Sequence, residues 1–478
     1  MSIAKIDVTE ALKNAERLLR QDRSASPQWR AMVDLLIVII NLLVRKFGAN
    51  STNSSLPPSQ DPHRQRGSKR SAPAQKRRPG GQNGHEGTTL QRDPNPTHIE
   101  GIAIDRRTIP PGRYKAAGFE ARQVIDIEIR KHVTEYRAEI LEDAKGDQFV
   151  AEFPAGVTRP VQYGNELKAQ SVYKSQKQWI PYGRVCDELR DQCGIALSAG
   201  SVFNFNRQAF ELLEEFHFES IVIRQLITED LLHVDETGIN VNGERRWLHC
   251  VCNARWTLYF PHERRGAEAM IAMGVLPRFR GKLGHDHWKA YFTFECLHFL
   301  CNGHHLRELQ RAWEDDGQRW AQKMHALLLE INDATGEAGG CLPEAQAESF
   351  RRRYRSILSS GDRECPPPLA KDRAGQRGPL AKTKSRNLLE RLRDFETETL
   401  RFMNDAAVPF TNNQAERDIR MEKVHQKISG CFRSMLGARI SCLVRSYIST
   451  CQKHGLSAME ALRILFLGRL PDFFPKLE

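Results

Sequence analysis

The sequence LLHVDETGINVNGERRW, residues 231–247, predicts a β-hairpin with an acidic residue on its first strand. Its apolar start favours a strand that places Asp235 at its end. The Asn-Gly pair at 242–243 favours a tight turn, so we expect residues 247–252 to form the partner strand. A carboxylate at a strand end is a candidate metal ligand.

Two later segments carry acidic residues in comparable settings. In KLGHDHWKAYFTF, Asp286 precedes an aromatic-rich run that can enter a helix or finish a strand. FTNNQAERDIR predicts a helix that Thr411 or Asn412 caps, with Glu416 in its first turns. Three carboxylates that converge from separate elements suffice to hold two divalent cations of the kind that catalyse phosphodiester displacement.

The segments HVDET, GHDHWKAY, LCNGHHLREL and TNNQAERDIR occur in this order, and GGQNGHEG lies at residues 80–87. Together they resemble the DDE transposases of insertion-sequence family sixty-six, and the likeness spans most of the chain. The resemblance implies an RNase H-like α/β core, a mixed sheet flanked by helices, with Asp235, Asp286 and Glu416 as catalytic and metal-binding triad. It implies two Mg²⁺ or Mn²⁺ ions per site, cleavage at the 3′ ends of the element, and strand transfer into target DNA.

Two alternatives to a transposase remain open. One is an RNase H-like, structure-directed DNA nuclease that cuts without joining. The other is a catalytically inactive DNA-binding protein. For the transposase, the expected partners are double-stranded DNA, as transposon ends and as target, a second copy of the chain in a homo-oligomer, and small accessory transposition proteins.

Composition agrees with a nucleic-acid partner. The 71 Lys and Arg residues exceed the 59 Asp and Glu residues, and the net charge of +12 favours polyanions. The 11 cysteines are scattered without the spacing of a disulfide framework, which is typical of reduced thiols in the cytoplasm. The most apolar run, residues 35–44, is too short to span a membrane, so no membrane partner is expected. The family resemblance adds a prokaryotic, nucleoid-associated setting.

Changes in composition and periodicity divide the chain into segments. The expected segments are an N-terminal helical part at 1–48, a basic disordered linker at 49–95, a small β-rich module at 96–160, a helical region at 161–222, a catalytic core at 223–310 and 405–455, a helical insertion at 311–404, and a C-terminal helical tail at 456–478.

Two of the segments before the core each allow two interpretations. In the N-terminal part, Val33, Leu36, Ile40, Leu43 and Phe47 have the spacing of a short coiled coil, and a helix packed within its own domain is the alternative. The linker is rich in Ser, Pro, Gly and basic residues, which is typical of disorder, and it is either a solvated connection or a DNA-contacting arm.

The β-rich module rests on residues 123–129, 132–140 and 149–153, which alternate or run apolar. Many members of the resembled family hold a zinc-binding module with paired Cys-x-x-Cys motifs at this position. No cysteine precedes Cys186 in this chain, so a thiolate zinc site is excluded there.

The helical region predicts a helix that ends near Cys193 at Gly194 and a second helix capped by Ser198 or Ser201. This outline fits a DNA-reading helix-turn-helix and equally any helical hairpin.

Several residues near the triad and in the linker are candidates for DNA contact. Arg417 either neutralises Glu416 or belongs to a row of cations that holds a phosphate backbone, and the second reading is favoured. His304 lies in a Cys-x-x-His pattern that also suits a metal, although cysteines on apolar strands usually pack as small hydrophobic residues. The candidate DNA-binding residues are Arg417, Arg420, Lys423, His304, Lys76, Arg77 and Arg78.

Overall fold

The structure is a computed structural model that describes residues 2–3, 6–21, 26–48, 90–368 and 381–475. Most of the predicted basic linker lies outside the described residues, including Lys76, Arg77, Arg78 and the GGQNGHEG segment. None of the described helices has the length and apolar character needed to cross a membrane.

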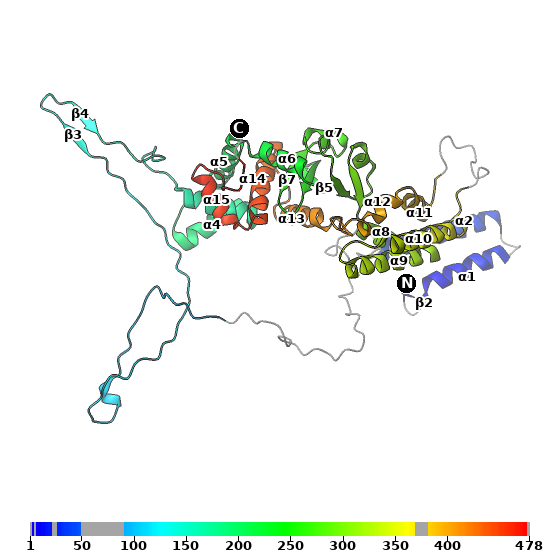
Figure 1. Cartoon of the computed structure of the whole chain (residues 1–478), viewed down its shortest axis with the longest axis horizontal. Coiled ribbons are helices and arrows are strands. Elements are labelled where there is room, and N and C mark those ends of the chain that lie inside the picture. The colour runs from blue at the N-terminus through cyan, green and yellow to red at the C-terminus, as the bar shows by residue number, and fades with distance from the viewer. Residues whose placement is uncertain (1, 4–5, 22–25, 49–89, 369–380, 476–478) are drawn as a thin grey trace.

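A five-stranded mixed sheet lies at the centre of the fold, between two groups of helices (Figure 1). Its strands are β5 (Leu231–Val241), β6 (Glu244–Cys252), β7 (Thr257–His262), β8 (Lys282–His285) and β9 (Leu297–Leu300). The strand order is β7-β6-β5-β8-β9, with β5, β6 and β7 antiparallel and β8 parallel to both β5 and β9. Helix α7 (Ala267–Ala272) joins β7 to β8, so the order of these elements along the chain is βββαβ.

The predicted hairpin is formed by β5 and β6. Val241 pairs with Glu244, and the two residues between them have positive φ angles, 51° at Asn242 and 83° at Gly243. Positive φ angles at both central residues are typical of a type I′ turn, whose backbone twist matches that of the two hairpin strands. The prediction for Asp235 needs a correction, because β5 continues to Val241 and Asp235 lies inside the strand. The strand is longer than its apolar start because β6 pairs with it from His233 to Val241.

The two faces of the sheet have different coverings. On one face, Ile239, Leu248 and Cys250 form a buried cluster with residues of α13 (Asn413–Ser429) and α14 (Met435–Lys453). On the opposite face, Leu232 and Val251 belong to a larger core that includes residues of α6 (Phe218–Thr228) and α7. Helices on both faces therefore bury the apolar side chains of the central strands.

The helical region before the sheet forms as predicted. Its elements are α3 (Asn165–Val172), a π-helical segment η2 (Tyr173–Lys177), α4 (Tyr182–Cys193), α5 (Ala199–Glu215) and α6. Gly194 ends α4 in the left-handed conformation with φ 62°, and the Ser198 hydroxyl accepts from the Ser201 amide to cap α5. The tail also contains the predicted helix, α15 (Ala458–Phe466), which packs against α3, α5 and α14.

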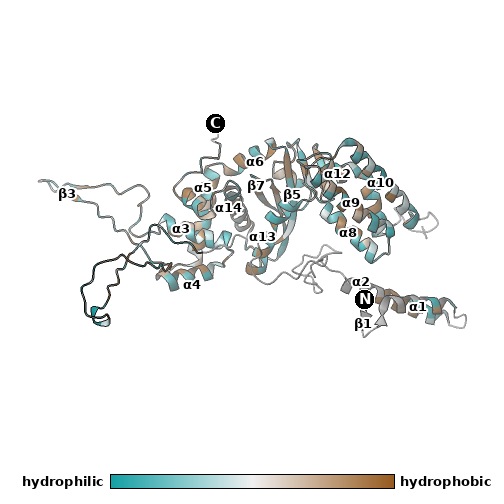
Figure 2. Cartoon of the chain, turned by 60° about the horizontal axis from the view of Figure 1, so that its bottom comes forward, coloured by the Kyte–Doolittle hydropathy of each residue, from teal (hydrophilic) through white to brown (hydrophobic). Residues whose placement is uncertain are grey.

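The residues between the sheet and α13 form a second group of helices on the other side of the sheet in both views (Figure 1, Figure 2). These are α8 (Asn302–Glu314), α9 (Arg319–Glu337), α10 (Glu344–Glu364), α11 (Lys384–Asp394), α12 (Glu396–Leu400) and η5 (Arg401–Met403). Trp320, Leu328, Tyr354 and Leu389 are buried in a core of their own. A separate core is what a helical insertion requires.

The N-terminal part is helical, as predicted. Short strands β1 (Ser2–Ile3) and β2 (Ile6–Asp7) precede α1 (Val8–Gln21) and α2 (Pro27–Gly48). Along α2, the predicted coiled-coil residues Leu36, Ile40 and Leu43 are exposed. Self-association through this helix stays a prediction.

The predicted β-rich module is not formed. Residues 90–160 are all described, and their strands are limited to β3 (Ile140–Glu142) and β4 (Gln148–Val150), a hairpin that projects from the rest of the chain (Figure 1). Apolar residues such as Val124 and Phe149 are exposed. Alternating apolar residues predict a strand, but a sheet needs a second layer that buries one face, and this segment has none among the described residues.

The close approach of β8 and β9 leads to a prediction about Gly284. A Cβ atom at this position would overlap the ring of Phe299, which is buried on β9. We expect Gly284→Ala to lower the free energy of unfolding by about 1–3 kcal/mol, because the core must shift to admit the methyl group. Urea denaturation measures this change.

Two further variants check the cause. Phe299→Leu in the Gly284→Ala background should recover part of the loss. Gly183→Ala, in α4 where nothing lies within 4 Å of the added Cβ, should not destabilise the protein. An equal loss in both glycine variants would contradict the steric explanation.

A buried cluster joins α13 to the helical region. Trp179, just after η2, stacks on His425 of α13 with 4.4 Å between ring centroids. Arg445 of α14 also lies over the Trp179 ring, with its Cζ atom 4.6 Å from the ring centroid. The Nε atom of Arg445 lies 3.6 Å from the Glu422 carboxylate. These contacts fix α13 relative to the helices on its far side.

The pKa of His425 leads to a prediction about acid stability. Burial, with the nearby Arg445 cation, lowers this pKa to about 4 from 6.5. The unfolded chain therefore binds the proton more tightly, and stability falls as the pH drops below about 6.5. The His425→Phe variant keeps the stacking but has no imidazole to protonate. We expect its free energy of unfolding, relative to that of wild type, to increase by about 2 kcal/mol when the pH is lowered from 8 to 5.

Urea denaturation at the two pH values measures this gain. His132→Phe, at an exposed position, is the control and should leave the pH dependence unchanged. A parallel pH dependence in wild type and His425→Phe would contradict the prediction.

Candidate functional site

Asp235 and Asp286 lie side by side on two adjacent strands, Asp235 within β5 and Asp286 directly after β8. Parallel pairing of β5 with β8 matches His233 with Gly284, and continuing this register brings Asp235 level with Asp286. Strand β8 ends at His285, so Asp286 follows it directly, and its Oδ1 atom accepts from the Trp288 amide at 2.9 Å. Since the strands are parallel and adjacent, both carboxylates are presented where β8 stops.

Glu416 comes from the first turn of α13, which packs on β5 and β6. The helix start is tied to the sheet by Asn412, whose side chain donates to the Val234 carbonyl at 2.7 Å and contacts His233 Nδ1 at 2.7 Å. Asn412 therefore has the predicted N-cap position, but its side chain binds β5 instead of capping α13. These two hydrogen bonds fix the start of α13, and with it Glu416, relative to β5.

Asp286 and Glu416 both lie within electrostatic reach of Asp235. Burial raises the pKa of Asp235 to about 7, and the charges of Glu236, Asp286 and Glu416 add to this increase. The structure therefore brings together the residues that the sequence singled out. Their mutual repulsion is what a bound cation would relieve.

Two residues at the start of α8 adjoin Glu416. Its Oε1 atom lies 3.7 Å from Cys301 Sγ and 3.7 Å from His304 Nδ1. Burial lowers the pKa of His304, which favours the neutral imidazole, and its buried Nδ1 atom has no hydrogen-bond partner among the described residues. Burial raises the pKa of Cys301 to about 11, so this thiol stays protonated and the Asn412 amide donates to its sulfur at 3.2 Å.

Glu236 is a buried site residue that the sequence reasoning missed. Its side chain is 2% exposed, with Arg265 Nη2 at 2.6 Å and the Tyr291 hydroxyl donating to it. Burial and the neighbouring Asp286 raise the pKa of Glu236. In the sequence, only the position of Glu236 next to Asp235 indicates that it belongs to the site. Arg265 and Tyr291, which contact it, come from later segments of the chain.

A second group of possible metal ligands lies in the core between the sheet and α13. It consists of Cys250, Cys252 and Asp418. Lys453 already binds the Asp418 carboxylate at 2.6 Å, and burial raises the pKa of Cys250 well above its ordinary value. A protonated Cys250 thiol beside a carboxylate that Lys453 neutralises fits core packing better than a metal site.

Exposed cations continue along α13 from Glu416. Arg417, Arg420 and Lys423 are all exposed. From the insertion, Arg391 of α11 lies within electrostatic reach of Asp286 and pairs with Glu308. The acidic site is therefore bordered by positive charge on two sides.

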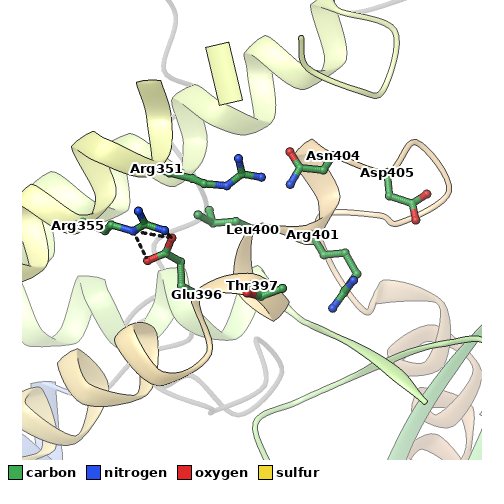
Figure 3. Close-up of a pocket in the computed structure, with 8 residues that line it drawn as sticks. All are labelled: Arg351, Arg355, Glu396, Thr397, Leu400, Arg401, Asn404 and Asp405. Carbon is green, nitrogen blue, oxygen red and sulfur yellow. Dashed lines mark hydrogen bonds and ion pairs between the residues drawn. The ribbon is translucent and has the colours of Figure 1, made fainter. Parts of the chain in front are cut away.

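A hollow of about 270 Å³ lies in the insertion, apart from these carboxylates (Figure 3). It is lined by Arg351, Arg355, Glu396, Thr397, Leu400, Arg401, Asn404 and Asp405. Its acidic and basic residues partly neutralise one another, as in the Arg355–Glu396 pair at 2.8 Å. We assign the hollow no role in the site.

Comparison with known families agrees with this geometry. Residues 160–440 match the family described as Transposase IS66 family, and residues 4–91 match a family of unknown function (DUF6444). None of the curated proteins is a significant match. The first match covers the sheet, the insertion and α13, more than half of the chain, and the chain therefore belongs to the IS66 family of transposases.

Proposed function

We propose that this transposase cleaves the 3′ ends of an insertion sequence and joins them to target DNA by a DDE mechanism on an RNase H-like core. The observation that carries the proposal is that Asp286, directly after β8, and Glu416, on α13, both lie within electrostatic reach of Asp235 on β5. Three antiparallel strands followed by two parallel ones support the RNase H-like assignment.

The family implies a divalent metal cofactor, and the donors of this site fit one. Carboxylate oxygens are the ligands that Mg²⁺ and Mn²⁺ prefer, and we propose that Asp235, Asp286 and Glu416 hold two such ions. Bound there, the ions would supply activation of the attacking oxygen and charge stabilisation of the leaving oxygen. The raised pKa of Asp235 supports the fit, because it marks a site with excess negative charge.

The chain's own residues have separate roles around the carboxylates. Neutral His304 orients Glu416 or accepts a proton from the attacking group, since its free Nδ1 faces that carboxylate at 3.7 Å. Arg417, Arg420 and Lys423 hold the DNA backbone, because their exposed charges line α13 beside the site. Transposon ends and target are both double-stranded DNA, and a homo-oligomer with accessory proteins would hold two ends together.

The test uses the purified chain, an element end already cleaved to a free 3′-hydroxyl, a target plasmid, and Mg²⁺ or Mn²⁺. Joined product that depends on the metal is the expected result. Hydrolysed ends without joined product would favour the structure-directed nuclease. Binding without any cleavage or joining, also after the accessory proteins are added, would favour an inactive DNA-binding protein.

A further inference from the structure

Two tryptophans and two arginines alternate in a continuous stack next to the acidic site. Arg245 lies over the Trp247 ring at 4.6 Å from its centroid, and Arg265 approaches the same ring at 5.0 Å. Arg265 also lies over Trp288 at 4.2 Å. We call these four residues, Arg245, Trp247, Arg265 and Trp288, the Arg–Trp stack.

Local structure explains why the stack forms on this face. Arg245 and Trp247 are two residues apart on β6, so their side chains share one face of the sheet. Gly238 pairs with Trp247 on the neighbouring strand, and a Cβ atom there would lie 2.9 Å from Arg245 Nε. The glycine therefore leaves room for the guanidinium group to lie across the sheet.

This face changes character along the strands. Near Leu232 and Val251 it is buried in the core that α6 and α7 share. Further along β6, Trp247 is only half-buried and Arg245 is exposed, and the Arg265 side chain is 41% exposed. The Arg–Trp stack is therefore open to solvent where the helices stop covering the sheet.

Two contacts join the stack to the acidic site. The Trp288 amide donates to Asp286 Oδ1 at 2.9 Å. Arg265 binds Glu236, the residue next to Asp235, at 2.6 Å. Trp288 and Arg265 therefore lie beside Asp286 and Glu236, whereas the strand register places Arg245 and Trp247 on the face of the sheet opposite to the Asp235 side chain.

Indole rings and guanidinium planes offer stacking surfaces to nucleobases that have left a duplex. A paired base cannot use such a surface because its faces are already stacked on neighbouring bases. The positive charge of Arg245 and Arg265 adds attraction to the phosphates of the same strand. The chemistry of the stack thus favours an unpaired DNA strand over an intact duplex.

We propose that the Arg–Trp stack binds unpaired nucleobases of the DNA strand whose phosphate lies at the acidic site. The inference rests on the proposed function for its substrate, and it adds a requirement that the duplex opens beside the reacting phosphate. Trp247 and Trp288 are both half-buried, and the Trp288 amide contacts the Asp286 carboxylate.

The test measures binding only, in the Asp235→Asn background of the full chain, so it does not depend on catalysis. Two fluorescent element ends are compared by anisotropy, one fully paired and one with three unpaired bases next to the cleavage position. We expect the unpaired end to bind about 10-fold more tightly. Trp247→Ala should remove this preference and leave the affinity for the paired end unchanged.

Three further variants make the result specific. Trp247→Phe keeps an aromatic face and should keep most of the preference, whereas Trp247→Leu keeps apolar bulk without a ring and should lose it. Trp313→Ala, at an exposed tryptophan of α8, should change neither affinity. Three results would overturn the proposal. The first is a preference for the unpaired end that survives Trp247→Leu, the second is equal binding of both ends by the protein with the unaltered stack, and the third is no binding of either end. Failure of the wild-type protein to join DNA ends would instead count against the proposed function. The comparison of binding affinities for the two ends could still be interpreted.

Discussion

Asp235→Asn and Glu416→Gln are expected to eliminate metal-dependent joining of a DNA end, with a rate loss on the order of 10³-fold or more. Each replacement keeps the shape of the side chain and removes the negative charge that would hold a divalent cation. Binding of the DNA end should persist, because the exposed cations of α13 are untouched. Product formation and anisotropy, measured on the same preparations, separate the two effects.

The metal-free protein offers a second readout for Asp235. Burial and three neighbouring carboxylates raise its pKa to about 7, so its ionised form opposes folding above that pH. Asp235→Asn should therefore raise the melting temperature of the metal-free protein at pH 8. A structural carboxylate would behave in the opposite way, since its removal would lower that temperature.

Glu263→Gln provides the matched control, because Glu263 is exposed on the segment after β7. It should keep joining activity and leave the melting temperature unchanged. Full joining by either Asp235→Asn or Glu416→Gln would remove that residue from the proposed triad. Loss of DNA binding in all three variants would point to a general defect instead.

The sequence predicted those parts of the site that depend on local patterns. The hairpin follows from the apolar run before Asp235 and from the Asn-Gly turn, and both are features of a single short segment. The end of α4 at Gly194 and the start of α5 at Ser198 were predictable for the same reason. The family resemblance supplied the order of the three acidic residues, which no local pattern contains.

The remaining features depend on contacts between distant segments. Thr411 or Asn412 was expected to cap the helix with its side chain, but the Asn412 side chain instead makes two hydrogen bonds to β5. Glu236 meets Arg265 and Tyr291 only after β7, α7 and β8 have folded around it. In residues 96–160 the local pattern predicted strands that do not form. The alternating apolar residues there have no second layer of described residues that would bury them.

Arg445→Met is expected to cause the largest loss of stability, about 3–5 kcal/mol. Glu422 is 1% exposed, and burial raises its pKa while the Arg445 cation lowers it. Without Arg445 the buried Glu422 carboxylate loses the cation that lowers its pKa, and the Gln176 carbonyl loses a hydrogen bond of 3.1 Å. Because Glu422 lies on α13, the same change should loosen the helix that carries Glu416.

Urea denaturation of two further variants distinguishes this cause from simple loss of a large side chain. Arg439→Met removes an arginine from the same helix, but its side chain is 58% exposed and its partner Glu214 lies at 3.4 Å, so the loss should stay below about 1 kcal/mol. Glu422→Gln combined with Arg445→Met should recover much of the stability, because no buried charge remains. Equal losses for Arg439→Met and Arg445→Met would show that the Glu422–Arg445 pair does not hold α13 in place. Recovery in the double variant would locate the cost in the unpaired carboxylate of Glu422, in the middle of the helix that carries Glu416.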